Sequence, residues 1–250
     1  MALLAIGSVH ASPGVTTTAL ALAAVWERAG QHPLFLECDP DGGMVAARYG
    51  LGHHPSLSEL GAAARAGLDP DEVWQFAQLL PGDLAAVLAH PSAEQCGAAL
   101  RTAGPRIGER FANLAGYDVI ADVGRLRPGT PAAGVIERAA MVVLVLRPRL
   151  DEIDVVGPRL AALNQHGNVG LVFVGERPYR PAEVGAALGV EVLGVVAHDE
   201  RSAHTIAGAG GSSRALRRLP LLRSIRSLAT DLAKRLDGAL QASPSEQVAR

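Results

Sequence analysis

Apolar residues fall along the chain into short continuous runs, which alternate with longer stretches where they recur every three or four positions. A short apolar run is typical of a buried strand, and the three-to-four spacing is typical of a helix with one buried face. The runs predict strands at residues 3–6, Pro33–Glu37, Leu84–Leu88, Tyr117–Gly124, Met141–Leu146, Val169–Val174 and Val190–Ala197. The other stretches predict helices at Thr16–Glu27, Ser56–Arg65, Asp69–Leu79, Ala93–Leu114 (one helix or two, around Gly104-Pro105), Asp151–Asn164, Pro181–Leu188 and Leu221–Leu240.

The alternation of strands and helices predicts the fold class. Strands joined through helices form a mostly parallel sheet with helices on both faces, connected by right-handed crossovers. The 250 residues, 48% of them hydrophobic, are enough to bury the core of one such α/β domain. We therefore expect a single doubly wound domain over residues 1–240 and a polar C-terminal tail over residues 241–250.

Composition and charge narrow the class of protein. The formal net charge of −2 gives no overall bias towards nucleic acid or acidic lipid. The two cysteines, Cys38 and Cys96, lie far apart in the sequence and suggest neither a disulfide framework nor a metal cluster, which favours a reducing compartment. Neither a signal peptide nor an apolar run long enough to span a bilayer is evident. These features predict a cytoplasmic protein.

The first predicted strand leads into a loop of small residues, Gly7 to Gly14, and three threonines then open the first predicted helix. Free backbone N–H groups and the helix dipole make such a strand, loop and helix a cradle for phosphate. The loop resembles the deviant Walker A motif of the ParA/MinD family of P-loop ATPases, K-G-G-x-G-K-T-T, whose positions fall on residues 10–17. Gly14, Thr16 and Thr17 match that pattern.

Both lysines of the family pattern are missing. His10 stands where the family has the lysine that reaches the nucleotide of a dimer partner, and Val15 stands where it has the lysine that holds the β- and γ-phosphates. Pro13 has no N–H to donate to a phosphate. The resemblance implies a nucleotide site at Gly14, Val15, Thr16 and Thr17, which takes ATP or ADP with magnesium or, given the missing charge, no cofactor at all.

A second segment matches the family at the end of the next predicted strand. Pro33–Glu37 is followed by Cys-Asp-Pro-Asp-Gly-Gly, which resembles the D-x-D-P-Q-G segment called switch I, with Glu37 and Asp39 on the two acidic positions. The resemblance implies that Asp39 helps to place an attacking water. The alternative is a turn at the end of a strand, which Asp-Pro-Asp-Gly forms without any catalytic role.

The strand Tyr117–Gly124 ends in Asp-Val-Gly and resembles the family's Walker B strand. The resemblance implies that Asp122, together with Thr16, holds magnesium. Arg125 and Arg127 follow in the switch II position. They are candidates for the positive charge that the loop lacks, although surface arginines beside a turn are the commoner case.

The segment from Gly189 to Arg201 resembles the family's L-G-V-I-P-x-D-x-x turn, which contacts bound adenine. That likeness implies nucleotide contacts from His198 and Asp199, with Ala197 in place of the usual proline. The resemblance as a whole covers residues 3–236, and its motifs occur in the family's order.

The last predicted helix has an apolar face and a basic face. The apolar face carries Leu222, Ile225, Leu228, Leu232 and Leu236. The basic residues at or before its start are Arg214, Arg217, Arg218, Arg223 and Arg226. They suggest a patch for DNA phosphates, but a solvated helix face is the favoured interpretation. The polar tail does not resemble the amphipathic membrane helix that ends MinD-type members, so we expect no direct membrane anchoring.

Three hypotheses for function follow. Electrostatic stabilisation dominates phosphoryl transfer, and the loss of both lysines removes most of it. The first hypothesis is therefore a degenerate ParA/MinD-like protein with weak or no ATP hydrolysis, a positioning or scaffold component that forms a homodimer or docks protein partners. Relatives of this kind serve chromosome or plasmid partitioning, division-site placement or localisation of pilus machinery.

The second hypothesis is a slow Mg-ATPase, in which Thr16, Asp39 and Asp122 hold the metal and Arg125 or a partner's arginine supplies charge. The third is a non-specific DNA-binding module that uses the arginines around the start of the last helix. A dinucleotide oxidoreductase is disfavoured, because no G-x-G-x-x-G follows the first strand.

Overall fold

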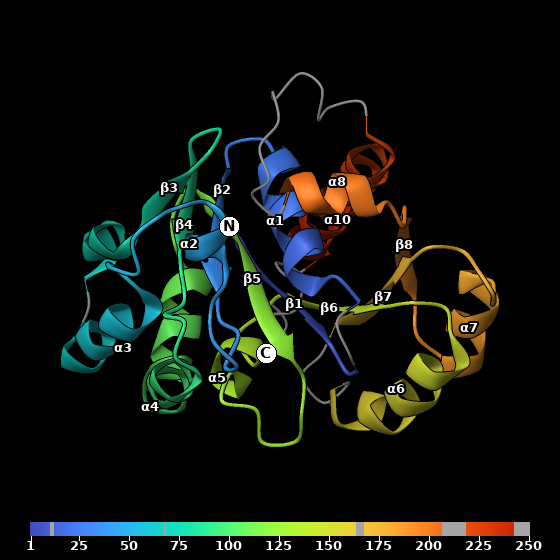
Figure 1. The fold of residues 1–250 in the computed structure, drawn as a ribbon, viewed down its shortest axis with the longest axis horizontal. Coiled ribbons are helices and arrows are strands. Elements are labelled where there is room, and N and C mark those ends of the chain that lie inside the picture. The colour runs from blue at the N-terminus through green and yellow to red at the C-terminus, as the bar shows by residue number, and fades with distance from the viewer. Residues whose placement is uncertain (11–12, 68, 164–167, 207–218, 243–250) are drawn as a thin grey trace.

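The computed structural model describes residues 1–10, 13–67, 69–163, 168–206 and 219–242. Within them, a single eight-stranded sheet runs through the molecule in the order β3-β4-β2-β5-β1-β6-β7-β8 (Figure 1). Neighbouring strands are parallel, except that β3 and β4 are antiparallel. The strands are β1 (Ala2–Ser8), β2 (His32–Glu37), β3 (Gln78–Leu80), β4 (Leu84–Val87), β5 (Tyr117–Arg125), β6 (Met141–Leu146), β7 (Val169–Val174) and β8 (Val192–Val196).

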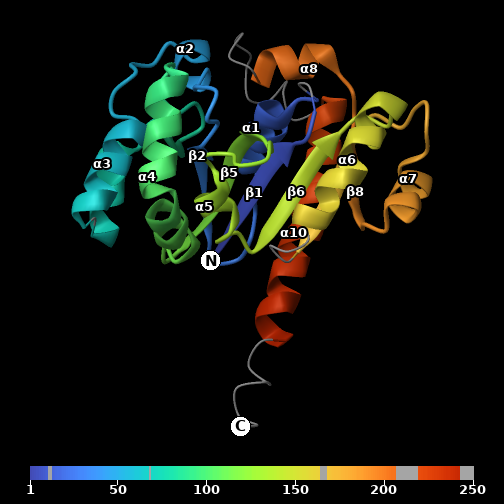
Figure 2. The ribbon, with the colours of Figure 1, turned by 90° about the horizontal axis from the view of Figure 1, so that it is seen from below.

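Helices cover both faces of the sheet, which confirms the predicted fold class (Figure 2). They are α1 (Val15–Val25), α2 (Val45–Arg48), α3 (Leu57–Ala66), the 3-10 helix η1 (Pro70–Phe76), α4 (Ala93–Ala112), α5 (Ala133–Ile136), α6 (Leu150–Leu163), α7 (Pro181–Leu188), α8 (Glu200–His204) and α10 (Pro220–Ala242). Among the helices described, none is long and apolar enough to cross a membrane.

The core has two halves because successive residues of a strand point to opposite faces. In β1, Leu3 and Ala5 pack with α3, α4, α5, α6 and α7, whereas Leu4 and Ile6 pack with α1, α2, α8 and α10. The predicted apolar face of the last helix is buried in the second half, with Ile225 and Leu232 fully inaccessible.

One predicted helical segment differs from the structure, and another, predicted as one helix or two, is settled. The helix expected at Asp69–Leu79 is wrong beyond Phe76: η1 ends there, and Gln78–Leu80 forms β3, because its backbone pairs antiparallel with β4. The segment Ala93–Leu114 forms one continuous helix, α4, through Pro105. Pro105 packs closely on α5, since a Cβ added at Gly134 would lie 2.5 Å from its Cδ.

The strand register gathers the predicted site at one edge of the sheet. Asp122 of β5 lies opposite Ile6 of β1 and Glu37 of β2. The carboxyl ends of these three neighbouring parallel strands therefore open into the same crevice, where ligands of open α/β sheets bind.

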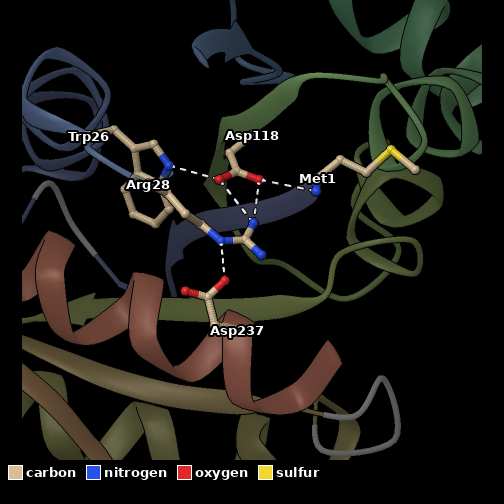
Figure 3. Close-up of polar contacts among 5 residues, drawn as sticks. All are labelled: Met1, Trp26, Arg28, Asp118 and Asp237. Carbon is tan, nitrogen blue, oxygen red and sulfur yellow. Dashed lines mark hydrogen bonds and ion pairs between the residues drawn. The ribbon is translucent and has the colours of Figure 1, made fainter. Parts of the chain in front are cut away.

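A network of charged side chains lies at the opposite end of the central strands, around the buried pair of Asp118 and Arg28 (Figure 3). The carboxylate of Asp118, near the start of β5, accepts hydrogen bonds from Trp26 Nε1 at 3.0 Å and from Arg28 Nη1 at 2.8 Å. Arg28 Nε in turn donates to Asp237 of α10 at 2.8 Å. This network ties the segment after α1, the sheet and α10 together far from the candidate site.

Candidate functional site

The N-terminus of α1 forms a cradle of unsatisfied backbone donors. Gly14 precedes the helix in the left-handed region, with φ of 99°, a conformation that favours glycine. Among the described residues no side chain caps this end of the helix, and its first turn carries no acidic residue. The first N–H groups therefore face the crevice with the positive end of the helix dipole, as an anion requires.

The side chains of the cradle differ from those of a charged phosphate loop. Val15 is 8% exposed and packs in the apolar core on the α1 side of the sheet. Its side chain is therefore directed away from the crevice, and only its backbone remains for a ligand. His10 is exposed, and Pro13 is buried. The cradle keeps its shape and dipole, but Val15 brings no charge to it.

Asp122 and Thr16 form the position where a divalent cation would sit. The Asp122 side chain is fully buried, and its Oδ1 accepts a hydrogen bond from the Gly124 N–H at 3.0 Å. Its Oδ2 is buried without a hydrogen-bond partner among the described residues. The Thr16 hydroxyl is near enough to favour the ionised carboxylate, although it forms no hydrogen bond of normal geometry with Oδ2.

Burial raises the pKa of Asp122 to about 7, against the opposing effects of Thr16 and Gly124. A buried carboxylate oxygen without a partner is costly unless a proton or a cation satisfies it. A threonine hydroxyl and a carboxylate are oxygen donors of the kind that magnesium prefers. The residues present therefore fit Mg²⁺, which would be held by Thr16 and Asp122 and would neutralise phosphate charge.

Asp39 lies over the end of β5. Its carboxylate accepts the Asp41 N–H at 2.9 Å and stands so close to Gly124 that a Cβ added there would lie 2.4 Å from Asp39 Oδ1. Burial raises the pKa of Asp39, whereas Arg125 and Arg127 lower it through their charge. Asp39 therefore lies near Asp122, as the hypothesis of a shared metal site requires. It also holds the turn after β2, which the alternative interpretation of this segment predicts without a catalytic role.

Glu37 has a structural task in the same segment. Its buried carboxylate accepts the backbone N–H groups of Met44 at 3.0 Å, Val45 at 3.2 Å and Ala89 at 3.0 Å. Its pKa is raised, mainly because burial disfavours the ionised form. This carboxylate joins β2, the segment before α2 and the end of β4, so it fixes the chain on both sides of Asp39.

A cavity of about 300 Å³ extends from the cradle towards the end of β8. Thr17 and Gly14 line one side, and His198 and Asp199 line the other. The structure thus brings together residues that the sequence assigned to nucleotide binding from opposite ends of the chain. The carboxylate of Asp199 also caps α8 by accepting the Ser202 N–H at 3.2 Å and the Ser202 hydroxyl, and that hydroxyl is the main cause of its lowered pKa.

Arg147 is a cation in this cavity that sequence reasoning missed. It follows β6, the strand next to β1, and therefore lies beside the cradle. Glu152, which is almost fully buried, accepts the Arg147 backbone N–H at 2.7 Å and lies 3.3 Å from its Nε. The sequence held one signal, a basic residue directly after a buried strand, but the strand order was needed to place it.

The structure describes only two of the five arginines proposed for DNA. Arg214, Arg217 and Arg218 lie outside the described residues. Arg223 is exposed near the start of α10, and Arg226 is half-buried. DNA binding therefore stays a prediction from the sequence.

Comparisons with known proteins agree with this architecture. No protein-family model and no curated protein sequence matches the chain. Among solved structures, a ParA family ATPase from Chlorobium tepidum matches with a TM-score of 0.76 and 15% identity, over 92% of this chain and 98% of that chain. The septum site-determining protein MinD from Pyrococcus horikoshii, complexed with Mg-ADP, matches with a TM-score of 0.76 and 14% identity, over 95% and 98%.

A third match is the MinC:MinD cell division protein complex of Aquifex aeolicus, with a TM-score of 0.62, 14% identity and coverage of 95% and 96%. At these identities the likeness concerns the fold, and it extends over nearly the whole length of both chains. The fold of this chain is that of the ParA/MinD ATPases.

Proposed function

We propose that this chain is a positioning or scaffold component built on the ParA/MinD fold, with little or no ATP hydrolysis. The observation that carries the proposal is the placement of Val15. Its side chain packs in the core at the position where the family pattern has a phosphate-binding lysine. Charge on the β- and γ-phosphates is therefore not neutralised from that position, and electrostatic stabilisation is the largest contribution to phosphoryl transfer.

The processes that such a component serves are chromosome or plasmid partitioning, division-site placement or localisation of pilus machinery. The solved MinC:MinD complex supports a protein partner for this fold. A second copy of the chain is the other partner that the proposal includes. The ordered segment around Asp39 and Glu37 supports a surface kept rigid for docking, since three backbone N–H groups hold it through one carboxylate.

Turnover measurements test the absence of hydrolysis. We expect phosphate release from Mg-ATP at the background rate, with no difference between the wild type and Asp122→Asn. In cells, a fluorescent fusion should localise to a discrete position, and Asp122→Asn should localise equally well. Steady turnover that Asp122→Asn abolishes would contradict the absence of ATP hydrolysis. A fluorescent fusion spread evenly through the cell would contradict the positioning role.

A nucleotide-binding switch is the second candidate, because the site keeps part of its chemistry. The unpartnered oxygen of Asp122 beside Thr16 favours a bound cation, and the adjoining cavity contains Arg147. In this candidate the ligand is Mg-ATP or Mg-ADP, bound with slow or no hydrolysis. Arg147 and the first N–H groups of α1 supply its electrostatic attraction.

A thermal-shift titration separates the two candidates. A site filled at 100 times its Kd adds roughly 2.7 kcal/mol to the free energy of unfolding, which a melt resolves. The nucleotide switch predicts stabilisation by Mg-ADP that is lost in Thr16→Ala and Arg147→Ala. Arg149→Ala is the matched control, since that arginine lies two residues away and 56% of its side chain is exposed. If millimolar nucleotide does not shift the melting temperature, the nucleotide switch is contradicted and only the scaffold proposal remains.

A further inference from the structure

A second concentration of positive charge lies outside the cradle and its cavity. Arg101 of α4, Arg125 at the end of β5 and Arg127 in the following loop line a pocket of about 280 Å³, which we call the arginine pocket. Its remaining walls are residues 40–41, the first two turns of α4 and residues 128–131. Arg125 and Arg127 are also candidates for charge on a nucleotide in the cradle, but no nucleotide hypothesis uses Arg101 or the pocket as a ligand site.

The pocket holds more positive than negative charge. Asp41 is the acidic residue on its wall, and its Oδ2 pairs with Arg127 Nη2 at 3.0 Å. The nearby carboxylate of Asp39 also interacts with Arg125 and Arg127 through its charge, so one positive charge remains in excess. The Nε of Arg125 is buried and has no hydrogen-bond partner among the residues that the structure describes. A buried guanidinium N–H without an acceptor is costly, so an acceptor supplied by a ligand would be stabilising.

Helix α4 adds to the positive potential. This helix of 20 residues begins at Ala93, which lies on the pocket wall. Glu94 is acidic in the first turn, but its carboxylate accepts a hydrogen bond from the Ser92 hydroxyl at 2.7 Å, and it does not line the pocket. The Arg101 guanidinium lies close to Gly97, where an added Cβ would be 3.2 Å from its Nη1. The glycine thus lets the guanidinium lie along the helix at the pocket.

We propose that the arginine pocket is a binding site for a phosphate group, either a free phosphate ion or the phosphate of a phosphorylated side chain. Several guanidinium groups offer forked N–H donors that match phosphate oxygens. A phosphate also offers more acceptor oxygens than a carboxylate, so it can accept from more than one of these guanidinium groups at once.

Binding there would connect two segments of the candidate site. Residues 40–41 follow Asp39, and residues 125–131 follow Asp122. A phosphate held by Arg101, Arg125 and Arg127 would join both segments to α4. The pocket thus provides a way for a phosphate signal to stiffen the surface around Asp39, independently of nucleotide in the cradle.

Titration of the protein with inorganic phosphate at constant ionic strength, followed by calorimetry, tests the site. We expect Arg101→Ala to bind at least about tenfold more weakly than the wild type, because it loses a charge-assisted contact. Thr16→Ala in the cradle and the surface control Arg149→Ala should bind within about twofold of the wild type. Arg101 is exposed, so an unchanged melting temperature in Arg101→Ala shows that the variant is folded.

Further arms identify the source of the phosphate and the place of binding. Tighter binding of phosphoserine than of inorganic phosphate assigns the pocket to phosphorylated side chains, and the reverse assigns it to the free ion. Hydrogen exchange should slow in residues 39–43 and 125–131 on binding. Three results would overturn the proposal: no binding up to roughly 10 mM phosphate, loss of binding in Thr16→Ala but not in Arg101→Ala, or acetate binding as tightly as phosphate.

Discussion

Two aspartates on the same strand, four residues apart, are both fully buried, and the molecule treats them in opposite ways. Asp118 near the start of β5 accepts hydrogen bonds from Trp26 and Arg28, and the N-terminal amine lies 3.8 Å from its Oδ1 (Figure 3). Asp122 near the end of β5 accepts one from the Gly124 N–H, and its Oδ2 has no partner among the described residues.

The difference separates a structural carboxylate from one that is a candidate for ligand binding. Cations and donors around Asp118 compensate the cost of burying its charge, so its ion pair with Arg28 holds α1, the sheet and α10 together. Asp122 is left partly uncompensated beside a helix N-terminus, and such carboxylates cluster at binding sites. One end of β5 therefore carries a compensated buried carboxylate, and the other carries a carboxylate oxygen without a hydrogen-bond partner among the described residues.

The largest expected effect is at the structural carboxylate. Asp118→Ala should lower the free energy of unfolding by about 3–5 kcal/mol, because it leaves the Arg28 guanidinium, 6% exposed, without its buried partner. Urea unfolding at neutral pH measures this loss. Asp118→Asn keeps the shape and one acceptor oxygen, so it should lose less. A loss below about 1 kcal/mol in Asp118→Ala would show that the network does not hold the fold.

The ionised carboxylate of Asp122 should have the opposite effect on stability. The folded-state pKa of Asp122, about 7, lies above its ordinary value of 3.8. Between pH 3.8 and about 7, the folded chain therefore keeps a proton on this carboxylate, whereas the unfolded chain has released it. Its contribution to stability therefore falls as pH rises from about 4 to 7, by up to roughly 4 kcal/mol.

Asp122→Asn removes this dependence. We expect the variant to match the wild type near pH 4 and to exceed it in stability near pH 8, when both are measured by urea unfolding in a chelator. Added Mg²⁺ should stabilise the wild type at pH 8 and leave the variant unchanged. A variant less stable than the wild type at pH 8 would place Asp122 in the same structural class as Asp118.

Two glycines at the ends of β5 test the same difference between its ends, with smaller expected losses of stability. Gly116 and Gly124 have φ of 78° and 61°, so alanine is strained at both positions. An added Cβ meets nothing within 4 Å at Gly116, but at Gly124 it lies 2.4 Å from the carboxylate of Asp39. Gly116→Ala should cost about 1 kcal/mol in unfolding free energy, and Gly124→Ala about 2–3 kcal/mol. Equal costs would show that Asp39 moves freely.

Much of this architecture was readable in the sequence. The strands Met141–Leu146 and Val169–Val174 were predicted to the residue, because strands buried on both faces form uninterrupted apolar runs between polar ends. The capping box of Ser56 and Glu59 also marked the start of α3 correctly. Gln78–Leu80 was misassigned, because a three-residue edge strand exists only through its pairing with β4 and has no periodicity of its own.

The candidate site was predictable only where its residues belong to local motifs. Thr16 and Asp122 were placed together because Thr16 opens the helix after the first strand and Asp122 lies near the end of another strand. Arg147, by contrast, enters the cavity through the strand order, which puts β6 beside β1. The network of Asp118 was also missed, since its partners Trp26 and Arg28 lie 92 and 90 residues away. Contacts of that separation depend on topology rather than on any local pattern.

The smallest effect belongs to the outer member of the Asp118 network. Asp237 pairs with Arg28 at 2.8 Å, but 54% of its side chain is exposed, so water and salt screen the pair. Asp237→Ala should lower the free energy of unfolding by less than about 1 kcal/mol, and added salt should reduce even that difference. Thermal melts at low and high ionic strength measure it. A loss as large as that of Asp118→Ala would mean that Asp237 positions Arg28, because screening would not then limit its contribution.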